Sequence, residues 1–127
     1  MKKKVIYLAI LLLSCIHLSC KKTKNSKQCY QVKVISNYCP KTGSVLVSFT
    51  KANPDATPIK DNNNKIVAYQ AALLNVPEEF QIAEKTFYVT YHYDAELSKP
   101  DAVACPAIFG VVKILVSDSI SNEDCNK

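Results

Sequence analysis

The sequence predicts an all-β domain, built either as a small closed barrel or as a β-sandwich. Several segments alternate apolar and polar residues with the period of two that marks a half-buried strand. Clusters of Asn, Asp, Pro and Gly separate these segments and favour turns. Closure into a barrel would remove the exposed edges that a small sheet cannot otherwise hide. The five expected strands are residues 29–35, 44–50, 65–74, 85–94 and 107–116.

The first two strands show the alternation most plainly. Tyr30, Val32 and Val34 share one face of the first strand, and polar residues separate them. The second strand places Val45 and Val47 on one face. Two prolines soon after it predict its end, because proline cannot donate a hydrogen bond to a sheet.

The third strand is preceded by the sharpest turn signal in the chain. Residues 61–64 read Asp-Asn-Asn-Asn, and both residue types tolerate a left-handed backbone and bond their own main chain. This turn should join residues 59–60 to the strand at 65–74, which is apolar on both faces. A helix over residues 67–74 is the alternative, because Ala and Leu favour helices. The turn and the Ile-Val pair at the start favour a strand.

The next elements are a helical turn and the strongest strand. Proline suits the first helical position and acidic residues complement the helix dipole, so residues 75–80 predict one short helical turn with Phe80 facing inward. A plain loop is the alternative. The strand at 85–94 is rich in aromatic and β-branched residues, which fit a pleated surface.

The C-terminal part should contain a polar loop, a strand and a polar tail. The loop is expected at residues 95–104 and the tail at 117–127. Between them, residues 107–116 are apolar nearly throughout. Gly110 inside this strand suggests a bulge or a tight bend.

The N-terminus has the pattern of an export signal. Three lysines precede a short apolar run from residue 5 to residue 13, which is too short for a permanent membrane span. Ser-Cys then occurs twice, which resembles the lipobox of bacterial lipoproteins, where the cysteine is acylated. Cys20 is the preferred lipid site because it leaves four other cysteines, an even number. Cys15 fits the lipobox pattern better and is the alternative lipid site. A secreted protein without a lipid is a second alternative.

These features divide the chain into a signal peptide (1–19), a polar tether (20–28) and one β domain (29–127). From residue 28 onward, nine Lys stand against eleven Asp and Glu, a net charge of −2. The chain contains no Arg, the usual residue for bidentate contacts to phosphates and bases. We therefore expect no nucleic-acid partner.

Four cysteines remain for cross-links, namely Cys29, Cys39, Cys105 and Cys125. They lack the close Cys-x-x-Cys pairs of a zinc site, and disulfides form in exported proteins. Two disulfides are therefore expected, and the sequence leaves three pairings open. No metal site and no cofactor is expected.

Five features occur in a characteristic order, namely Cys-Pro-Lys-Thr-Gly at 39–43, Asn-Val-Pro-Glu-Glu-Phe at 75–80, the strand at 87–91, Cys105 and the apolar run at 111–114. Together they resemble small lipoproteins of Bacteroidota-type bacteria that have an OB-like, five-stranded barrel. The resemblance implies an OB-like barrel and a Cys39–Cys105 disulfide, and we expect Cys29–Cys125 to tie the two ends. The insertion at 52–64 and the cysteines at 29 and 125 depart from the family pattern. Such barrels often bind oligonucleotides or sugars, but a fold does not fix a function.

No catalytic motif occurs in the sequence. His92 is the only histidine after the signal, and no pattern supplies the partner that a catalyst would need. Asp94, Glu96 and Asp101 lack the spacing of a calcium loop. The candidate binding residues are therefore His92 and the aromatics Tyr88 and Tyr38, since tyrosine gives contact area at low entropy cost.

The functional expectation is a non-enzymatic binding or envelope-structural lipoprotein without a cofactor. Its partners would be the bilayer, through the acyl anchor, and an unidentified protein or glycan. In the resembled lipoproteins, acidic residues just after the lipid cysteine mark export to the cell surface. The resemblance therefore implies the periplasmic face of the outer membrane here, because lysines follow Cys20. The alternative is a periplasmic inhibitor of a hydrolase such as lysozyme, for which the loop at 95–104 is the candidate reactive segment.

Overall fold

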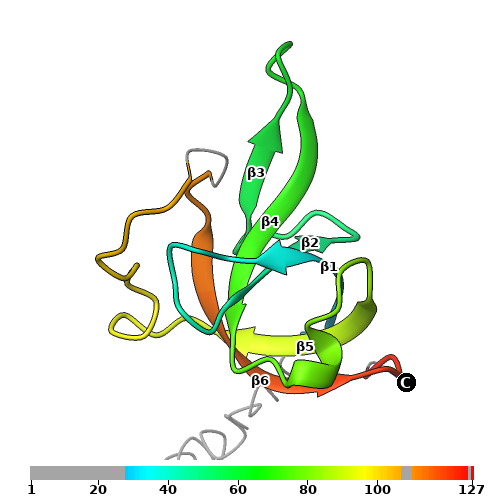
Figure 1. Cartoon of the computed structure of the whole chain (residues 1–127). Helices are drawn as coiled ribbons and strands as arrows, with labels where there is room; N and C mark the ends of the chain where they lie inside the picture. Colours follow the sequence, from blue (N-terminus) through cyan, green and yellow to red (C-terminus); the bar gives the residue numbers. More distant parts are fainter. Residues whose placement is uncertain (1–27, 107–109, 126) are drawn as a thin grey trace, which may run out of the picture.

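Six strands and one 3₁₀ turn form the protein in the computed structural model, which describes residues 28–106, 110–125 and 127 (Figure 1). The all-β prediction is confirmed, and residues 66–74 form a strand, not a helix. Phe80 is buried at the end of the expected helical turn. The elements are β1 (Tyr30–Asn37), β2 (Val45–Phe49), β3 (Thr57–Lys60), β4 (Ile66–Leu74), η1 (Glu78–Phe80), β5 (Thr86–His92) and β6 (Lys113–Ser121).

Five of the strands close into a barrel. Going round the ring, β1 pairs with β2, β2 with β4, β4 with β6, β6 with β5, and β5 again with β1. Only the β4–β6 pair is parallel. This ring, with η1 between β4 and β5, is an OB-like arrangement. The prediction of a barrel is confirmed, and the sandwich alternative is wrong.

The short strand β3 is an addition to the ring. It pairs with the first half of β4, and together they form a hairpin that projects from the barrel (Figure 1). Asp61 makes the predicted turn by accepting hydrogen bonds from the amides of Asn63 and Lys65 at 2.8 and 3.0 Å. Asn64 adopts a left-handed backbone with φ of 62°. Both properties were expected of an Asp-Asn-Asn-Asn turn.

The last strand lies later in the sequence than predicted. The expectation was a strand at 107–116 and a polar tail from 117, but β6 runs from Lys113 to Ser121. Residues 107–109 lie outside the part that the structure describes. β3 occupies the edge of β4 from Ile66 to Gln70, so β6 can join β4 only from Ala71, which pairs with Lys113.

The polar residues after 116 remain in the sheet because β5 holds them. Tyr88 pairs with Ser121, and Thr90 pairs with Ser119 through a hydroxyl contact of 2.7 Å. Ile120 packs against the barrel core. Ser119 and Ser121 alternate with the inward-facing Ile120, which is compatible with one solvated face, and the prediction of a polar tail there was wrong.

The chain builds two apolar clusters on opposite faces of the same strands. The barrel interior contains Val45, Val47, Leu73 and Leu115, with other apolar residues of β1 and β5. The intervening residues Leu46, Ala72, Leu74 and Ile114 face outward, and Tyr38 and Val112 pack over them. This second cluster explains why β4 and the start of β6 are apolar at consecutive positions.

Two disulfides link distant parts of the fold. Cys29 is bonded to Cys125, with Cα atoms 5.9 Å apart, and Cys39 to Cys105, with Cα atoms 5.8 Å apart. Both Cα separations are ordinary for disulfides. The first bridge ties the two ends of the domain, and the second joins the β1–β2 loop to the β5–β6 connection.

The signal peptide (1–19), both candidate lipid sites, Cys15 and Cys20, and the tether up to residue 27 lie outside the described residues. Among the residues that the structure describes, no helix is long and apolar enough to cross a membrane.

Candidate functional site

The face on which OB-like barrels usually bind ligands is covered in this protein. That face lies over the second and third barrel strands, between the loops that join strands one and two and strands four and five. Here these strands are β2 and β4, and their outward residues Leu46, Ala72 and Leu74 belong to the second apolar cluster. Tyr38, which is 4% exposed, comes from the first loop and Val112 from the second. The chain's own residues therefore cover this face of the barrel.

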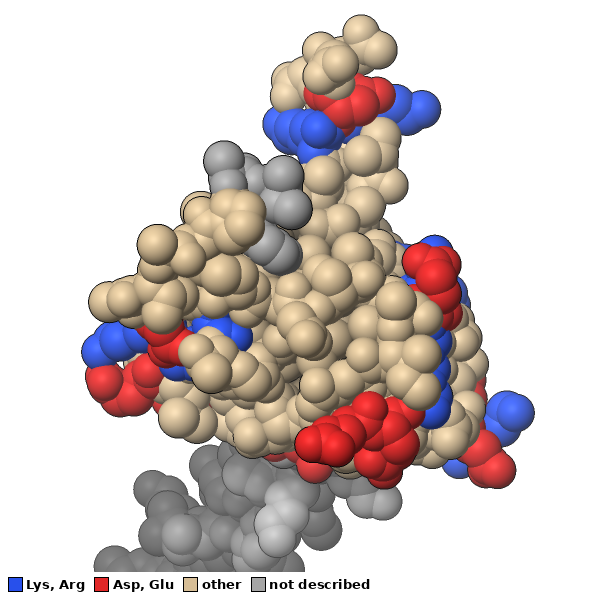
Figure 2. All heavy atoms as spheres, in the orientation of Figure 1, with Lys and Arg blue, Asp and Glu red and all other residues tan. Residues whose placement is uncertain are grey.

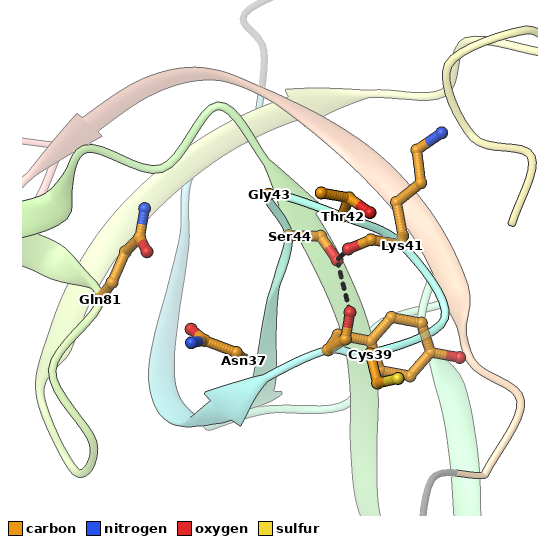
Figure 3. Close-up of a pocket in the computed structure, with 8 residues that line it drawn as sticks. Asn37, Cys39, Lys41, Thr42, Gly43, Ser44 and Gln81 are labelled. Carbon is orange, nitrogen blue, oxygen red and sulfur yellow. Dashed lines mark hydrogen bonds between the residues drawn. The ribbon is translucent and has the colours of Figure 1, made fainter. Parts of the chain in front are cut away.

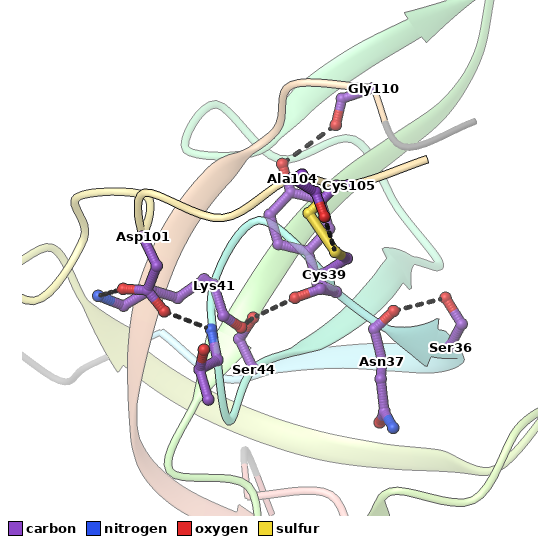
Figure 4. The surroundings of a disulfide bond; sticks show 11 residues. Ser36, Asn37, Cys39, Lys41, Ser44, Asp101, Ala104, Cys105 and Gly110 are labelled. Atoms are coloured by element: carbon purple, nitrogen blue, oxygen red, sulfur yellow. Dashed lines mark hydrogen bonds and ion pairs between the residues drawn. A yellow bond between two sulfur atoms is a disulfide. The ribbon is translucent and has the colours of Figure 1, made fainter. Parts of the chain in front are cut away.

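The two loops are held together by covalent and polar links (Figure 4). Besides the Cys39–Cys105 disulfide, Asp101 donates its amide to the carbonyl of Pro40 at 2.8 Å. Its carboxylate accepts hydrogen bonds from the Thr42 amide at 2.7 Å and from the Lys41 ammonium at 3.1 Å. These links fix the β5–β6 connection against the barrel.

Tyr38 provides a further link between the loops. Its hydroxyl donates to the carbonyl of Gly110 at 3.1 Å and accepts from the amide of Val112 at 3.2 Å. These bonds satisfy two backbone groups that lie just before β6, outside its ladder. Tyr38 is therefore a structural residue, and because it is buried, its choice as a candidate binding residue was wrong.

We expect the Asp101 link to depend on pH. The Thr42 amide, the Thr42 side chain and the Lys41 ammonium hold the pKa of Asp101 at about 2, below its ordinary value of 3.8. The folded-state pKa is depressed, so the link stabilises the fold above pH 3.8 and is lost as the pH falls through about 2. An NMR titration should show the Thr42 amide changing with this pKa.

Two substitutions test this titration, one at Asp101 itself and one at Asp61, a second carboxylate that accepts backbone amides. Asp101→Asn should abolish the transition at Thr42. Asp61→Asn, at the distant hairpin tip, should leave it unchanged. A Thr42 transition that persists in Asp101→Asn would show that another group titrates there.

A shallow pocket of about 320 Å³ lies beside the β1–β2 loop (Figure 3). Asn37 and Gln81 lie on one side of it, and Thr42 and Lys41 on the other. Ser44, in its lining, donates to the carbonyl of Lys41 at 2.7 Å. Lys41 is paired with Asp101 across the loops, so much of the polar lining of this pocket serves to hold the loop.

A second cavity, of about 490 Å³, has the composition of a recognition site. It lies where the β5–β6 connection leaves the barrel, beside the β2–β3 loop. Ligand sites are typically concavities of this size, with apolar and aromatic walls and a few polar groups, and they occur at the mouths of barrels. It is lined by Asp55, Tyr91, His92, Tyr93, Lys113 and Leu115.

A rigid polar cluster forms one wall of this cavity. Tyr91 lies with its hydroxyl 3.1 Å from the Asp55 carboxylate and accepts from the amide nitrogen of buried Asn53 at 2.7 Å. The Asn53 oxygen in turn accepts from the amide of Asp55 at 2.8 Å. Burial raises the pKa of Tyr91 well above its ordinary value. The hydroxyl therefore stays protonated and cannot act as a base at neutral pH.

The ring of Tyr91 is fixed as firmly as its hydroxyl. It stacks on Tyr30, with centroids 5.6 Å apart, and meets Phe49 edge-on at 5.9 Å. Aromatic pairs at such distances add to the stability that burial supplies. Beneath the cavity, Leu115 is 2% exposed and belongs to the barrel core. The wall and floor of the cavity are thus parts of the rigid barrel.

His92 contributes an oriented imidazole. Its Nδ1 lies 2.7 Å from the carboxylate of Asp118 on β6. Because an ionised carboxylate only accepts hydrogen bonds, Nδ1 is the donor. The sequence did not reveal this carboxylate partner. The partner found for His92 among the described residues is therefore a carboxylate, which can orient the imidazole ring as the third member of a triad does.

The remaining rim residues are exposed and of mixed character. Tyr93 is 67% exposed and presents the most accessible aromatic surface of the cavity. Lys113 reaches the carbonyl of Pro54 at 3.5 Å. Asp55, which lies in the β2–β3 loop, adds a carboxylate to the lining. The rim therefore offers one cation, one anion, an imidazole and an aromatic ring.

The structure does not bring the three predicted binding residues together. His92 lines the cavity, whereas Tyr38 is buried under the loops. Tyr88 is half-buried and lines a different pocket, of about 360 Å³, beside Cys29 and Asp124.

The acidic residues of the β5–β6 connection are engaged internally. Asp94 accepts hydrogen bonds from the amides of Leu97 and Glu96, which lower its pKa. Glu96 pairs with Lys99 at 2.8 Å. Within the described residues, no group of three or more His, Cys, Asp or Glu side chains is arranged to hold a metal ion.

Sequence reasoning missed most of the cavity. From the sequence, the segment around Pro54 indicates only the end of the second strand, and Lys113 belongs to the apolar run at 111–114. The available signal was the inward face of β5, where Tyr91 and Tyr93 follow Phe87 and Val89. Tyrosines at the end of an apolar face carry hydroxyls that need polar partners, but the sequence does not say which residues supply them.

Comparisons of the chain with protein-family models, with curated proteins and with solved structures found no match.

Proposed function

We propose that this protein is a non-enzymatic binding module of the bacterial cell envelope, anchored to the outer membrane through an acylated Cys20. The observation that carries the binding role is the cavity around Tyr91. It has the size, the aromatic wall and the convergent polar groups of a ligand site. Burial keeps its tyrosine hydroxyl protonated, and among the described residues its histidine is hydrogen-bonded to the carboxylate of Asp118. These groups suit recognition better than catalysis.

The binding role can be tested by NMR. The full-length protein in detergent micelles is titrated with fractionated envelope components, namely glycans, peptides and small metabolites. We expect one fraction to shift the signals of Tyr93, Lys113 and His92 and to be recovered chemically unchanged. A fraction that is converted to product would contradict the non-enzymatic role, and the absence of any shift at the cavity would contradict the binding role.

The anchor is supported by the sequence alone. The lysines, the short apolar run and the Ser-Cys exit form an export signal with a lipid site. Lipidation of Cys20 would leave Cys29, Cys39, Cys105 and Cys125, the four cysteines that pair in the fold. The polar tether would let the domain stand off the membrane, and its lysines favour the periplasmic face.

Intact mass spectrometry tests the anchor. Protein purified from its native membrane should carry a diacyl or triacyl mass on Cys20 and lack residues 1–19. Alkylation should add at four cysteines, and only after reduction. An unlipidated mass, or a lipid on Cys15 with one thiol that alkylates without reduction, would contradict this assignment.

An inhibitor of a hydrolase such as lysozyme is the second candidate function. The β5–β6 connection favours it, because Asp101 and Cys105 both fasten this segment to the β1–β2 loop. Between these two points, residues 102–104 are exposed, and Val103 is 50% exposed. A segment held in one conformation loses little entropy on binding. Inhibition of lysozyme by the intact protein, lost when the segment is released, would favour this candidate.

A further inference from the structure

We infer that the cavity around Tyr91 takes a pyranose unit of an uncharged glycan, with the sugar ring against Tyr93. This inference rests on the proposed binding function and names the ligand class for the same site. Three features of the cavity carry it, namely an exposed aromatic ring, a balanced set of polar groups and a lining with a single aliphatic residue.

The aromatic ring supplies the apolar contact. One face of a pyranose carries mainly C–H groups, and an aromatic ring offers a flat apolar surface with a negative face. Tyr93 is 67% exposed beside a cavity of about 490 Å³, whereas Tyr91 is held at the wall by its neighbours. Tyr93 is therefore the ring against which a ligand can stack without disturbing the fold.

The polar groups match hydroxyls. A sugar hydroxyl both donates and accepts, so its site needs acceptors and donors together. Asp55 offers a carboxylate held by Tyr91, and Lys113 offers an ammonium. His92 adds an imidazole whose Nδ1 is committed to Asp118. Both kinds of group surround one cavity.

The charge balance disfavours the other ligand classes. One Lys and one Asp line the cavity, and the chain has no Arg, so a phosphate or a polyanion finds no cluster of cations. A lipid chain would need a deep apolar cavity, but Leu115 is the one aliphatic residue in the lining. On the face of the molecule that Figure 2 shows, most charged side chains lie at the margins and near the hairpin tip.

The test is a titration of the full-length protein in micelles with two neutral oligosaccharides, chitotetraose and maltotetraose. At least one should bind and shift the signals of Tyr93 and Lys113. Tyr93→Ala should weaken that binding by about tenfold, because it removes the stacking surface. Asp55→Asn should weaken it as well, through the loss of a charged acceptor.

The matched control is Leu97→Ala. Leu97 lies in the same β5–β6 connection and is 49% exposed, but it is not part of the cavity lining. Its substitution should leave the affinity unchanged. Thermal unfolding of each variant shows whether the fold is intact, and Tyr93 is exposed enough for its loss to be tolerated.

The outcomes separate this inference from the proposed function. Binding of either sugar that Tyr93→Ala and Asp55→Asn leave unchanged would overturn the assignment to this cavity. Binding of a peptide or an anionic metabolite at the cavity, with no response to either sugar, would overturn the ligand class and leave the binding function standing. No response at the cavity to any ligand class would overturn both.

Discussion

Replacing Phe87 with alanine should lower the free energy of unfolding by about 3–5 kcal/mol, the usual cost of truncating a buried phenylalanine. Phe87 is 1% exposed in the barrel interior and meets the ring of Phe80 edge-on, with centroids 5.4 Å apart. Phe80 comes from η1, so the contact also fastens the turn over that end of the barrel. The loss would be a large part of the roughly 5–15 kcal/mol that stabilises a domain of this size.

Urea unfolding followed by circular dichroism measures this effect. The matched control is Ile82→Ala, in the loop between η1 and β5, because Ile82 is 59% exposed. Its cost should stay within about 0.5 kcal/mol. If Phe87→Ala cost less than about 1 kcal/mol, the end of the barrel near η1 would not be packed as the structure has it.

Removing the Cys39–Cys105 disulfide should cost about 4 kcal/mol. The two cysteines are 66 residues apart, and a bridge that closes a loop of this length removes about that much chain entropy from the unfolded state. The double variant Cys39→Ala, Cys105→Ala is therefore expected to unfold at a markedly lower temperature. Calorimetry of the oxidised proteins measures the difference.

The Cys29–Cys125 bridge provides the control. Its removal should lower the free energy of unfolding by a similar amount, but it should loosen a different part of the domain. Cys29 and Cys125 are 96 residues apart, and the entropy depends only on the logarithm of loop length. Hydrogen exchange separates the two variants. Loss of Cys39–Cys105 should speed exchange in residues 95–106, whereas loss of Cys29–Cys125 should act at the chain ends. Equal exchange in both variants would show that the β5–β6 connection does not depend on its bridge.

The sequence was sufficient for the features that depend on neighbours along the chain. Alternation in β1, β2 and β5 revealed strands and their inward faces, since the side-chain period of a strand is two. The backbone preferences of Asn, Asp and Pro predicted the Asp-Asn-Asn-Asn turn and the helical turn η1. The four cysteines, together with the expected export of the chain, predicted a disulfide-linked domain.

The candidate site was predicted only in part, because its residues come from three separated segments. His92 was named, but its partner Asp118 lies 26 residues away on β6. Asn53 and Asp55 belong to the site because they form hydrogen bonds with the hydroxyl of Tyr91. Periodicity tells which face a residue occupies, and it carries no information about the strand that lies opposite.

The sequence by itself determined that this chain forms a β domain with two disulfides, because local patterning and cysteine content suffice for that. Only the tertiary structure decided where β6 begins, because β3 pairs with β4 up to Gln70 and leaves the edge of β4 free for β6 only from Ala71 onward. It also decided that Tyr38 covers the outer face and that a cavity remains beside Tyr91. These outcomes depend on which strand edges and faces stay free after the other segments have packed, and that is a property of the whole fold.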